Sequence, residues 1–154
     1  MNIRPKTSVI TRLTAEGTSH ARTVAQARDV SLVIDEPVER GGTNEGLAPT
    51  ETGLAALMGC TNVIANKVAH AQGVDIGHLR MTLACDFDRR GVTLAEEVAV
   101  PFTAIRLRIE ADGPATQAEL DRVAADVAKF CPLSKLFKAA GTQVTEEWVA
   151  RAPS

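Results

Sequence analysis

The chain has 154 residues, 45% of them hydrophobic and 23% charged, a balance typical of one compact domain over residues 1–154. Its net charge of −2 and 3% aromatic content exclude no enzyme class, but they give no basis for binding nucleic acid or an anionic membrane. No apolar run approaches the roughly 20 residues of a membrane span, and the first residues lack the apolar stretch of a secretory signal. We therefore expect a cytoplasmic protein.

The N-terminal third predicts a β-meander followed by a loop. Alternating apolar residues indicate strands near residues 9–15, 19–25 and 30–35, with turns at Glu16-Gly17 and Arg28-Asp29. Residues 41–49 are rich in Gly, Asn and Pro, as in loops.

A long helix is predicted from about residue 50 to residue 71, closed by Gly73. One side of it is apolar, and the opposite side carries mostly small residues: Gly53, Ala56, Cys60 and Val63. In a domain of this size, a helix buried on both sides would need cover from a second subunit.

The C-terminal half predicts two strands, two helices and a last strand. The strands alternate over residues 79–88 and 105–110, and Thr116 with Glu119 forms a capping box that opens a helix ending before Pro132. A short helix over 134–140 and a strand over 142–149 follow. The order β-β-β-α-β-β-α-α-β is that of an α+β protein.

The three cysteines lie in different surroundings, and they are too few and too scattered for a disulfide scaffold. Cys85 is in phase with the buried face of its strand, which favours a core residue. Cys60 lies about 100° from the centre of the main apolar face of the long helix. Cys131 precedes the start of a helix, whose N-terminus favours a thiolate. Spacing alone leaves core packing open for both.

A reactive cysteine needs help from other side chains. A free thiol is only a few per cent ionised at neutral pH, so peroxide chemistry asks for a nearby cation. Arginine suits this role because it stays charged when partly buried, and a buried arginine in turn needs a carboxylate.

Two motifs resemble the OsmC/Ohr family. The first runs Gly41-Gly42-Thr43-Asn44, then Pro49, Glu51, Leu54-Ala55-Ala56-Leu57 and Cys60, and is similar to the family's central-helix signature. The second, Phe130-Cys131-Pro132-Leu133-Ser134, is similar to its second-cysteine motif. Gly59, where alanine is usual, and the additional Cys85 bring the chain nearer to the OsmC-like branch.

The resemblance implies an intertwined homodimer with an OsmC-like fold: an N-terminal β-meander, a long central helix, a second β-hairpin and two C-terminal helices. It implies a peroxidase for organic hydroperoxides, with Cys60 as the peroxidatic and Cys131 as the resolving cysteine. Glu51 matches the site carboxylate. The reductant would be a lipoylated protein or another dithiol, and neither a metal nor another cofactor is expected.

The arginine of the site comes from the N-terminal meander in this family. Arg22 has about the right distance from the third predicted strand, with Arg28 as the rival and Arg12 as a third candidate. Apolar side chains would line the site and favour organic peroxides: Leu57, Met58, Ile64, Phe130 and Leu133.

Helix geometry adds a prediction about the dimer. Nine residues separate Glu51 from Cys60, so on one straight helix they point about 180° apart and lie about 13.5 Å apart along the axis. We expect each site to combine Cys60 and Cys131 of one chain with Glu51, and Arg22, of the other.

Three alternatives compete with the peroxidase. The first is a non-catalytic protein that binds a small apolar ligand and keeps its cysteines for packing. A zinc site is disfavoured because the cysteines and His20, His70 and His78 lack ligand spacing. A Cys–His hydrolase would need His20 or His78 near Cys60 through the tertiary fold.

Overall fold

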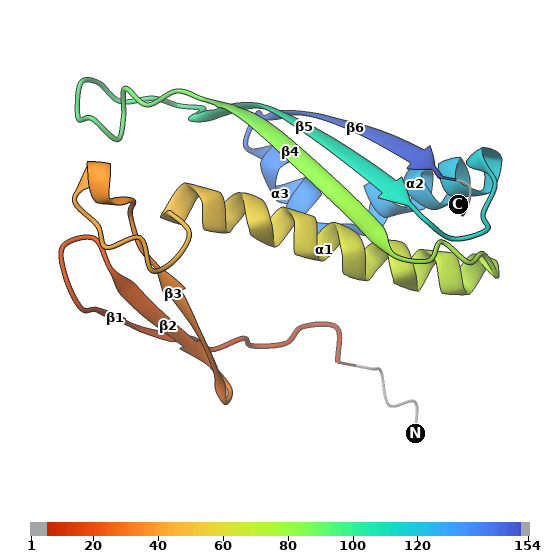
Figure 1. Ribbon diagram of the computed structural model, residues 1–154, viewed down its shortest axis with the longest axis horizontal. Helices are drawn as coiled ribbons and strands as arrows, with labels where there is room; N and C mark the ends of the chain where they lie inside the picture. Colours follow the sequence, from red (N-terminus) through yellow and green to blue (C-terminus); the bar gives the residue numbers. More distant parts are fainter. Residues whose placement is uncertain (1–5, 152–154) are drawn as a thin grey trace. The chain divides into compact units, whose positions relative to one another are not determined.

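The computed structural model describes residues 6–151 and divides the chain into two compact units, Met1–Gly53 and Leu54–Ser154. The predicted single domain over 1–154 stays a prediction. The predicted order of elements is confirmed, with one added 3-10 turn (Figure 1). The elements are β1 (Thr14–Gly17), β2 (Thr23–Ala27), β3 (Val30–Ile34), η1 (Val38–Arg40), α1 (Pro49–Gln72), β4 (Leu79–Phe87), β5 (Phe102–Ala111), α2 (Gln117–Phe130), α3 (Pro132–Ala139) and β6 (Gln143–Ala150).

The first unit is built on a three-stranded antiparallel sheet in the order β1-β2-β3. Arg28 has a φ of 57°, a left-handed conformation that closes the predicted turn between β2 and β3. The first strand differs from the prediction, because it covers Thr14–Gly17 instead of residues 9–15. β2 ends at Ala27, one residue beyond the partner of Thr14, so the chain before Leu13 has no strand opposite it.

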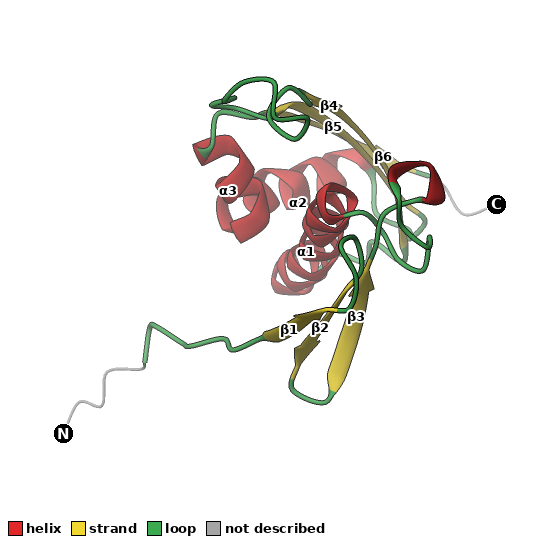
Figure 2. Ribbon diagram, turned by 90° about the vertical axis from the view of Figure 1, so that its left-hand side faces the viewer, coloured by secondary structure: helices red, strands yellow, loops and turns green. Residues whose placement is uncertain are grey.

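The second unit contains a sheet in the order β4-β5-β6. β4 and β5 are antiparallel, as predicted for a hairpin, whereas β6 runs parallel to β5. A parallel pair needs a crossover connection, and α2 and α3 provide it. The three helices lie on one face of this sheet (Figure 2).

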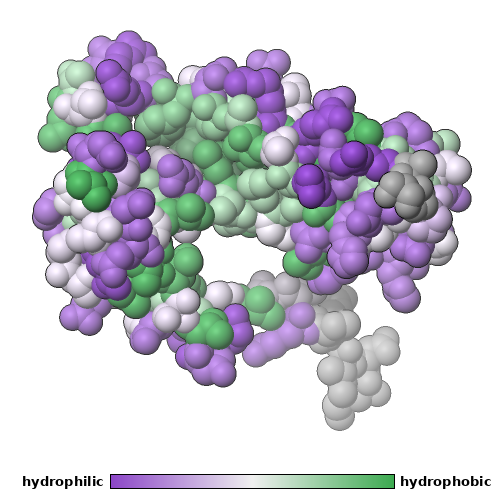
Figure 3. All heavy atoms as spheres, viewed as in Figure 1, coloured by the Kyte–Doolittle hydropathy of each residue, from purple (hydrophilic) through white to green (hydrophobic). Residues whose placement is uncertain are grey.

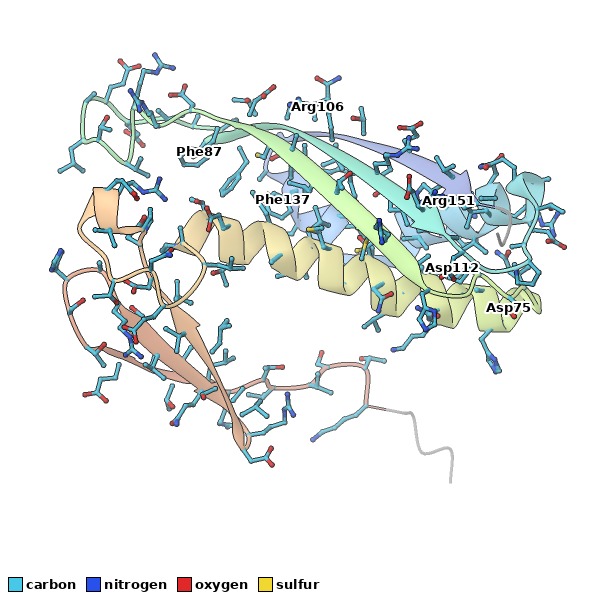
Figure 4. The ribbon with its side chains drawn as sticks, viewed as in Figure 1. Asp75, Phe87, Arg106, Asp112, Phe137 and Arg151 are labelled. Carbon is cyan, nitrogen blue, oxygen red and sulfur yellow. The ribbon has the colours of Figure 1, made fainter. Side chains whose placement is uncertain are left out.

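The core of the second unit lies between the sheet and its helices. The inward residues of β5, Ile105, Leu107 and Ile109, are buried against Leu120 and Val123 of α2. Phe102 makes edge-to-face contacts with Phe87 and Phe137, with ring centroids 5.1 and 5.4 Å apart. In Figure 4, Phe87 and Phe137 lie on the helix side of the sheet and Arg106 on its outer side. The alternation in β4 and β5 therefore follows the predicted faces.

α1 buries only one side within a single chain. Leu57, Thr61 and Ala65 are covered, whereas Gly59 is exposed and Val63 keeps 50% of its surface. Apolar residues also reach the surface in the first unit, as the space-filling view shows (Figure 3). Among residues 6–53, Ala48 is the one apolar residue that is buried. Much apolar surface is thus left uncovered by the chain itself.

No helix in residues 6–151 is long and apolar enough to cross a membrane.

Candidate functional site

Cys60 lies in the middle of α1 and is half-buried, with its side chain packed against the core of the second unit. Its neighbour Gly59 faces open space, since a Cβ atom built there would meet nothing within 4 Å. The departure from the usual alanine at this position therefore has no steric cause within the chain.

Cys131 joins α2 to α3 and is fully covered, with 0% of its surface exposed. It is the C-cap of α2 and continues the hydrogen-bond pattern of that helix, because its N–H donates to Val127 O at 2.9 Å. It is also the N-cap of α3, whose first residue is Pro132, a residue suited to that position because its φ is already helical. Cys131 is therefore both a buried core residue and a thiol at a helix N-terminus.

Burial raises the pKa of the Cys131 thiol. The backbone N–H groups of Ser134 and Leu133 act in the opposite direction, and the neighbouring Cys60 raises the pKa further. The prediction that the helix N-terminus favours the thiolate is right for this one contribution, but desolvation outweighs it.

Cys60 and Cys131 are thus neighbours, although they come from elements far apart in the sequence. Both thiols are free, and Cys60 lies close enough to the Cys131 sulfur to raise its pKa. Because Cys131 stays protonated at neutral pH, it can supply a proton as well as a sulfur to chemistry at Cys60. The fold has therefore brought together two thiols in different states of burial.

Ser134 lies beside this pair and is buried with 1% of its surface exposed. Its backbone N–H contacts the Cys131 sulfur, but its hydroxyl has no hydrogen-bond partner. Sequence reasoning gave Ser134 a place in the second-cysteine motif and at the start of the predicted short helix.

Cys85 belongs to the core-facing side of β4, as predicted, and packs against the core while remaining half-buried. Burial raises the pKa of this thiol, with Asp86 adding to the rise and Arg106 opposing it. A protonated thiol on a strand fits the predicted packing role.

Arg22 lies in the first unit at the start of β2, where the turn before it is tied by two hydrogen bonds to Ser19. Its Nη1 donates to Thr18 Oγ1 at 3.1 Å. Its Nε lies 3.1 Å from Glu45 Oε2, an ion-pair distance, although the N–H does not point at that oxygen. Arg22 is thus anchored on two sides. The rivals Arg28 and Arg12 are both exposed, Arg28 in the β2–β3 turn and Arg12 ahead of β1.

Asp35 follows β3 and is entirely covered. Thr43 Oγ1 donates to it at 2.5 Å, and the N–H groups of Glu36, Thr43 and Glu45 donate at 2.8, 3.1 and 3.1 Å. These bonds, the hydroxyl of Thr43 foremost, lower the pKa of Asp35 to about 2. Asp35 is therefore ionised at neutral pH, and its carboxylate holds the loop over residues 36–45 in place.

The loop approaches β3 so closely that it needs glycine. A Cβ atom at Gly42 would lie 1.9 Å from Glu36 O, and one at Gly46 would lie 2.2 Å from Val33 O. The Gly-rich sequence that predicted only a loop thus reflects tight packing around Asp35.

Glu51 lies in the first turn of α1, and its Oε2 accepts from the backbone N–H of Ala48 at 2.9 Å. This contact is half of a capping box, and it satisfies one of the free N–H groups at the helix start. Glu51 is not the ion-pair partner of Arg22 within this unit, because Glu45 is.

Sequence reasoning missed Asp35, Thr43 and Glu45 as members of one polar cluster. Residue 35 closes a predicted strand, and Thr43 belongs to the first family motif, but neither was expected to form a polar cluster with Glu45. A carboxylate followed eight residues later by a threonine in a Gly-rich loop was the available signal, since such side chains hydrogen-bond nearby loop backbone.

Among residues 6–151, none of the three histidines forms a hydrogen bond or an ion pair with a cysteine. His78 lies 3.7 Å from Asp112 at an exposed turn, and His70 is exposed in the last turn of α1. Within residues 6–151, no group of three or more His, Cys, Asp or Glu side chains is arranged to hold a metal ion.

Three comparisons relate the chain to known proteins. Residues 42–147 match the family model described as OsmC-like protein. A comparison with curated protein sequences finds no match. Among solved structures, the OsmC-like protein from Mycoplasma pneumoniae is 19% identical with a TM-score of 0.75, over 95% of this chain and 99% of that chain.

Two further similar structures carry a functional name. An organic hydroperoxide resistance protein OsmC from Legionella pneumophila is 18% identical with a TM-score of 0.68, over 92% of this chain and 97% of that chain. An organic hydroperoxide resistance protein from Elizabethkingia anophelis is 17% identical with a TM-score of 0.69, over 95% and 99%. At these identities the structures establish the shared α+β fold, and the family model spans well over half of the chain. The chain therefore belongs to the OsmC-like protein family.

Proposed function

We propose that this protein is a thiol-dependent peroxidase that reduces organic hydroperoxides. The observation that carries the proposal is the pairing of a half-buried Cys60 with a covered, protonated Cys131 at the N-terminus of α3. Similar structures named for organic hydroperoxide resistance support the choice of substrate class.

In the first step, the Cys60 thiolate attacks the terminal oxygen of the hydroperoxide. A sulfur–oxygen bond forms, the oxygen–oxygen bond breaks, and the alkoxide leaves and takes up a proton to become an alcohol. Cys60 is oxidised by two electrons to a sulfenic acid, and the peroxide is reduced. Arg22 is proposed to stabilise both the thiolate and the departing oxygen.

In the second step, the sulfur of Cys131 attacks the sulfur of the sulfenic acid. A disulfide forms, the sulfur–oxygen bond breaks, and hydroxide leaves with the proton of Cys131 as water. Because its pKa is raised, Cys131 keeps a proton that it can give to the leaving hydroxide, and this transfer produces the thiolate that attacks. An external dithiol, such as a lipoylated protein, then returns two electrons and two protons.

The site is proposed to form in a homodimer, with Glu51 and Arg22 supplied by the partner chain. α1 begins at Pro49, so Glu51 and Cys60 both belong to it and the argument from helix geometry applies. The exposed side of α1 and the thin core of the first unit also favour cover by a second copy. Keeping both thiols reduced between turnovers fits the expected cytoplasmic location.

Most of the side chains proposed to line the substrate site are covered within a single chain. Leu57 is buried, and Met58, Ile64 and Leu133 pack partly buried against the core. Phe130 is 62% exposed, so in a single chain it does not enclose anything. These side chains favour an alkyl hydroperoxide over hydrogen peroxide.

Counting free thiols before and after one equivalent of tert-butyl hydroperoxide tests the proposal. The reduced protein is expected to lose two thiols as an internal disulfide between Cys60 and Cys131. Cys60→Ser is expected to lose none, and Cys85→Ser is the matched control that still loses two. Unchanged thiols in the unsubstituted protein would instead support the non-catalytic, ligand-binding alternative.

A further inference from the structure

A continuous polar chain links the covered Asp35 to Arg22. Thr43 Oγ1 lies 2.5 Å from Asp35 Oδ2 and 2.6 Å from Glu45 Oε2. The same Glu45 oxygen lies 3.1 Å from Arg22 Nε. All of these residues belong to the first unit, so the chain is a property of that unit alone.

Each link restricts the next. Asp35 fixes the backbone of Thr43 and Glu45 through their N–H groups, and it fixes the Thr43 side chain through its hydroxyl. The single proton of the Thr43 hydroxyl is shared between Asp35 and Glu45, so Thr43 also restrains Glu45, whose side chain is 56% exposed and would otherwise be free to rotate. Glu45 and Thr18 finally hold two different nitrogens of Arg22.

We propose that Glu45 is a positioning residue that orients Arg22 toward the peroxidatic cysteine, and that Thr43 and Asp35 hold Glu45 for this task. The inference rests on the proposed peroxidase. It gives Glu45 a role separate from that of Glu51, which caps α1 and remains the carboxylate proposed to come from the partner chain.

A plain surface ion pair is the competing explanation, and exposed pairs of this kind contribute little to stability. Two observations favour a positioning role. The Arg22 side chain is only 26% exposed, and its contact with Glu45 lacks a hydrogen bond, so the pair is poorly built for stability alone. Glu45 is also restrained by the buried Asp35, through Thr43 and through its own backbone N–H, and a surface ion pair does not require this.

The two explanations predict effects of opposite sign at Cys60. If Glu45 only neutralised part of the charge of Arg22, Glu45→Gln would strengthen the positive field, favour the Cys60 thiolate and speed its oxidation. If Glu45 orients Arg22, the same substitution lets the guanidinium move away, so the Cys60 thiolate loses its cation and its oxidation slows.

The experiment measures single-turnover oxidation of Cys60 by tert-butyl hydroperoxide in full-length protein carrying Cys131→Ser. The pH profile of iodoacetamide alkylation is recorded in parallel, with Cys60→Ser as the blank. We expect Glu45→Gln to slow oxidation at least tenfold, within the roughly 100-fold loss that a 1 Å misplacement causes. The matched control Glu39→Gln, an exposed glutamate of η1, is expected to react like the parent.

Three further variants keep the test decisive. Thr43→Val is expected to behave like Glu45→Gln, and Thr43→Ser to restore the parent rate, because serine keeps the hydroxyl. Adding Glu45→Gln to Arg22→Ala is expected to slow oxidation no further than Arg22→Ala alone. Faster oxidation of Cys60 or faster alkylation of Cys60 at neutral pH in Glu45→Gln, or an unchanged oxidation rate in Thr43→Val, would overturn the inference.

Failure of the proposed function has a different signature. If Cys60 of the parent protein is not oxidised by the hydroperoxide, the peroxidase proposal is wrong. The alkylation profile then still decides the positioning role. Slower alkylation of Cys60 at neutral pH in Glu45→Gln that is absent from the Arg22→Ala background supports it, and an unchanged profile refutes it.

Discussion

Asp35 accepts four hydrogen bonds while completely covered by protein, and this single carboxylate organises the loop that carries Glu45. Cys131 shows the opposite balance, because burial outweighs the two N–H groups that face its sulfur. Two ionisable residues at loop or helix boundaries are therefore held in opposite protonation states at neutral pH. Hydrogen bonds decide the first case and desolvation decides the second.

The contribution of Asp35 to stability depends on pH in a defined window. Its pKa falls from 3.8 to about 2 on folding, so this contribution is complete above pH 3.8 and is lost as the pH falls through about 2. We expect Asp35→Asn to be less stable than the parent at pH 7, and the difference to shrink as the pH falls from 4 to 2. Urea unfolding at several pH values measures this, with the exposed Asp29→Asn as control; a difference that stays constant from pH 4 to pH 2 would contradict it.

Alkylation should report the raised pKa of Cys131. The folded thiol is expected to react with iodoacetamide with a midpoint above the ordinary value of 9.0, because burial favours its neutral form. The protonated thiol stabilises the folded state below pH 9.0, and this contribution is lost as the pH rises through the raised pKa. Mass spectrometry of peptides labelled across a pH series follows the reaction at Cys131. Protein unfolded in urea is the control, and a folded midpoint equal to the unfolded one would refute the expectation.

At the scale of elements, α2 was the best predicted part of the chain. Thr116 Oγ1 accepts from the N–H of Glu119 at 3.2 Å, and Glu119 Oε2 accepts from the N–H of Thr116 at 2.9 Å, which is the predicted capping box. The first strand was predicted poorly, because alternation over residues 9–15 says nothing about whether a partner strand lies opposite. Local signals determine a helix start, whereas pairing determines a strand.

The capping box should contribute measurably to stability. Thr116→Ala removes the side-chain acceptor at the start of α2, and we expect a loss of about 1 kcal/mol in the free energy of unfolding. Thr116→Ser, which keeps an oxygen at this position, is expected to lose less. Urea unfolding provides the measurement. Thr11→Ala, at an exposed position ahead of β1, is the matched control, and equal losses in Thr116→Ala and Thr11→Ala would argue against a working cap.

At the scale of the whole molecule, each unit leaves apolar surface open. The first unit buries a single apolar residue among residues 6–53. Only one side of α1 is covered by the rest of the chain. Exposed apolar patches of this kind mark interaction surfaces. The proposed site also requires a second copy of the chain, because nine residues along a straight helix place Glu51 and Cys60 on opposite sides of α1.

Assembly in solution tests this at the same scale. We expect sedimentation to give twice the mass of one chain, and Val63→Glu on the exposed side of α1 to shift the population toward monomer because it places a charge in the interface. The shift should lower peroxide reduction along with assembly. Thr82→Glu, on the outer side of β4, is the matched control and should remain dimeric. A monomeric parent protein would contradict the dimer and the shared site together.

The sequence by itself determined the α+β order, the capped start of α2, the closure of α1 at Gly73 and the strand face of Cys85, because these depend on residue spacing and local bonding. It also singled out Cys60 and Cys131 by their motifs. Only the tertiary structure decided that the two thiols are neighbours, that burial keeps Cys131 protonated, and that Arg22 pairs with Glu45 instead of Glu51 within the first unit. These outcomes depend on desolvation and on contacts between residues distant in sequence, which no local pattern encodes.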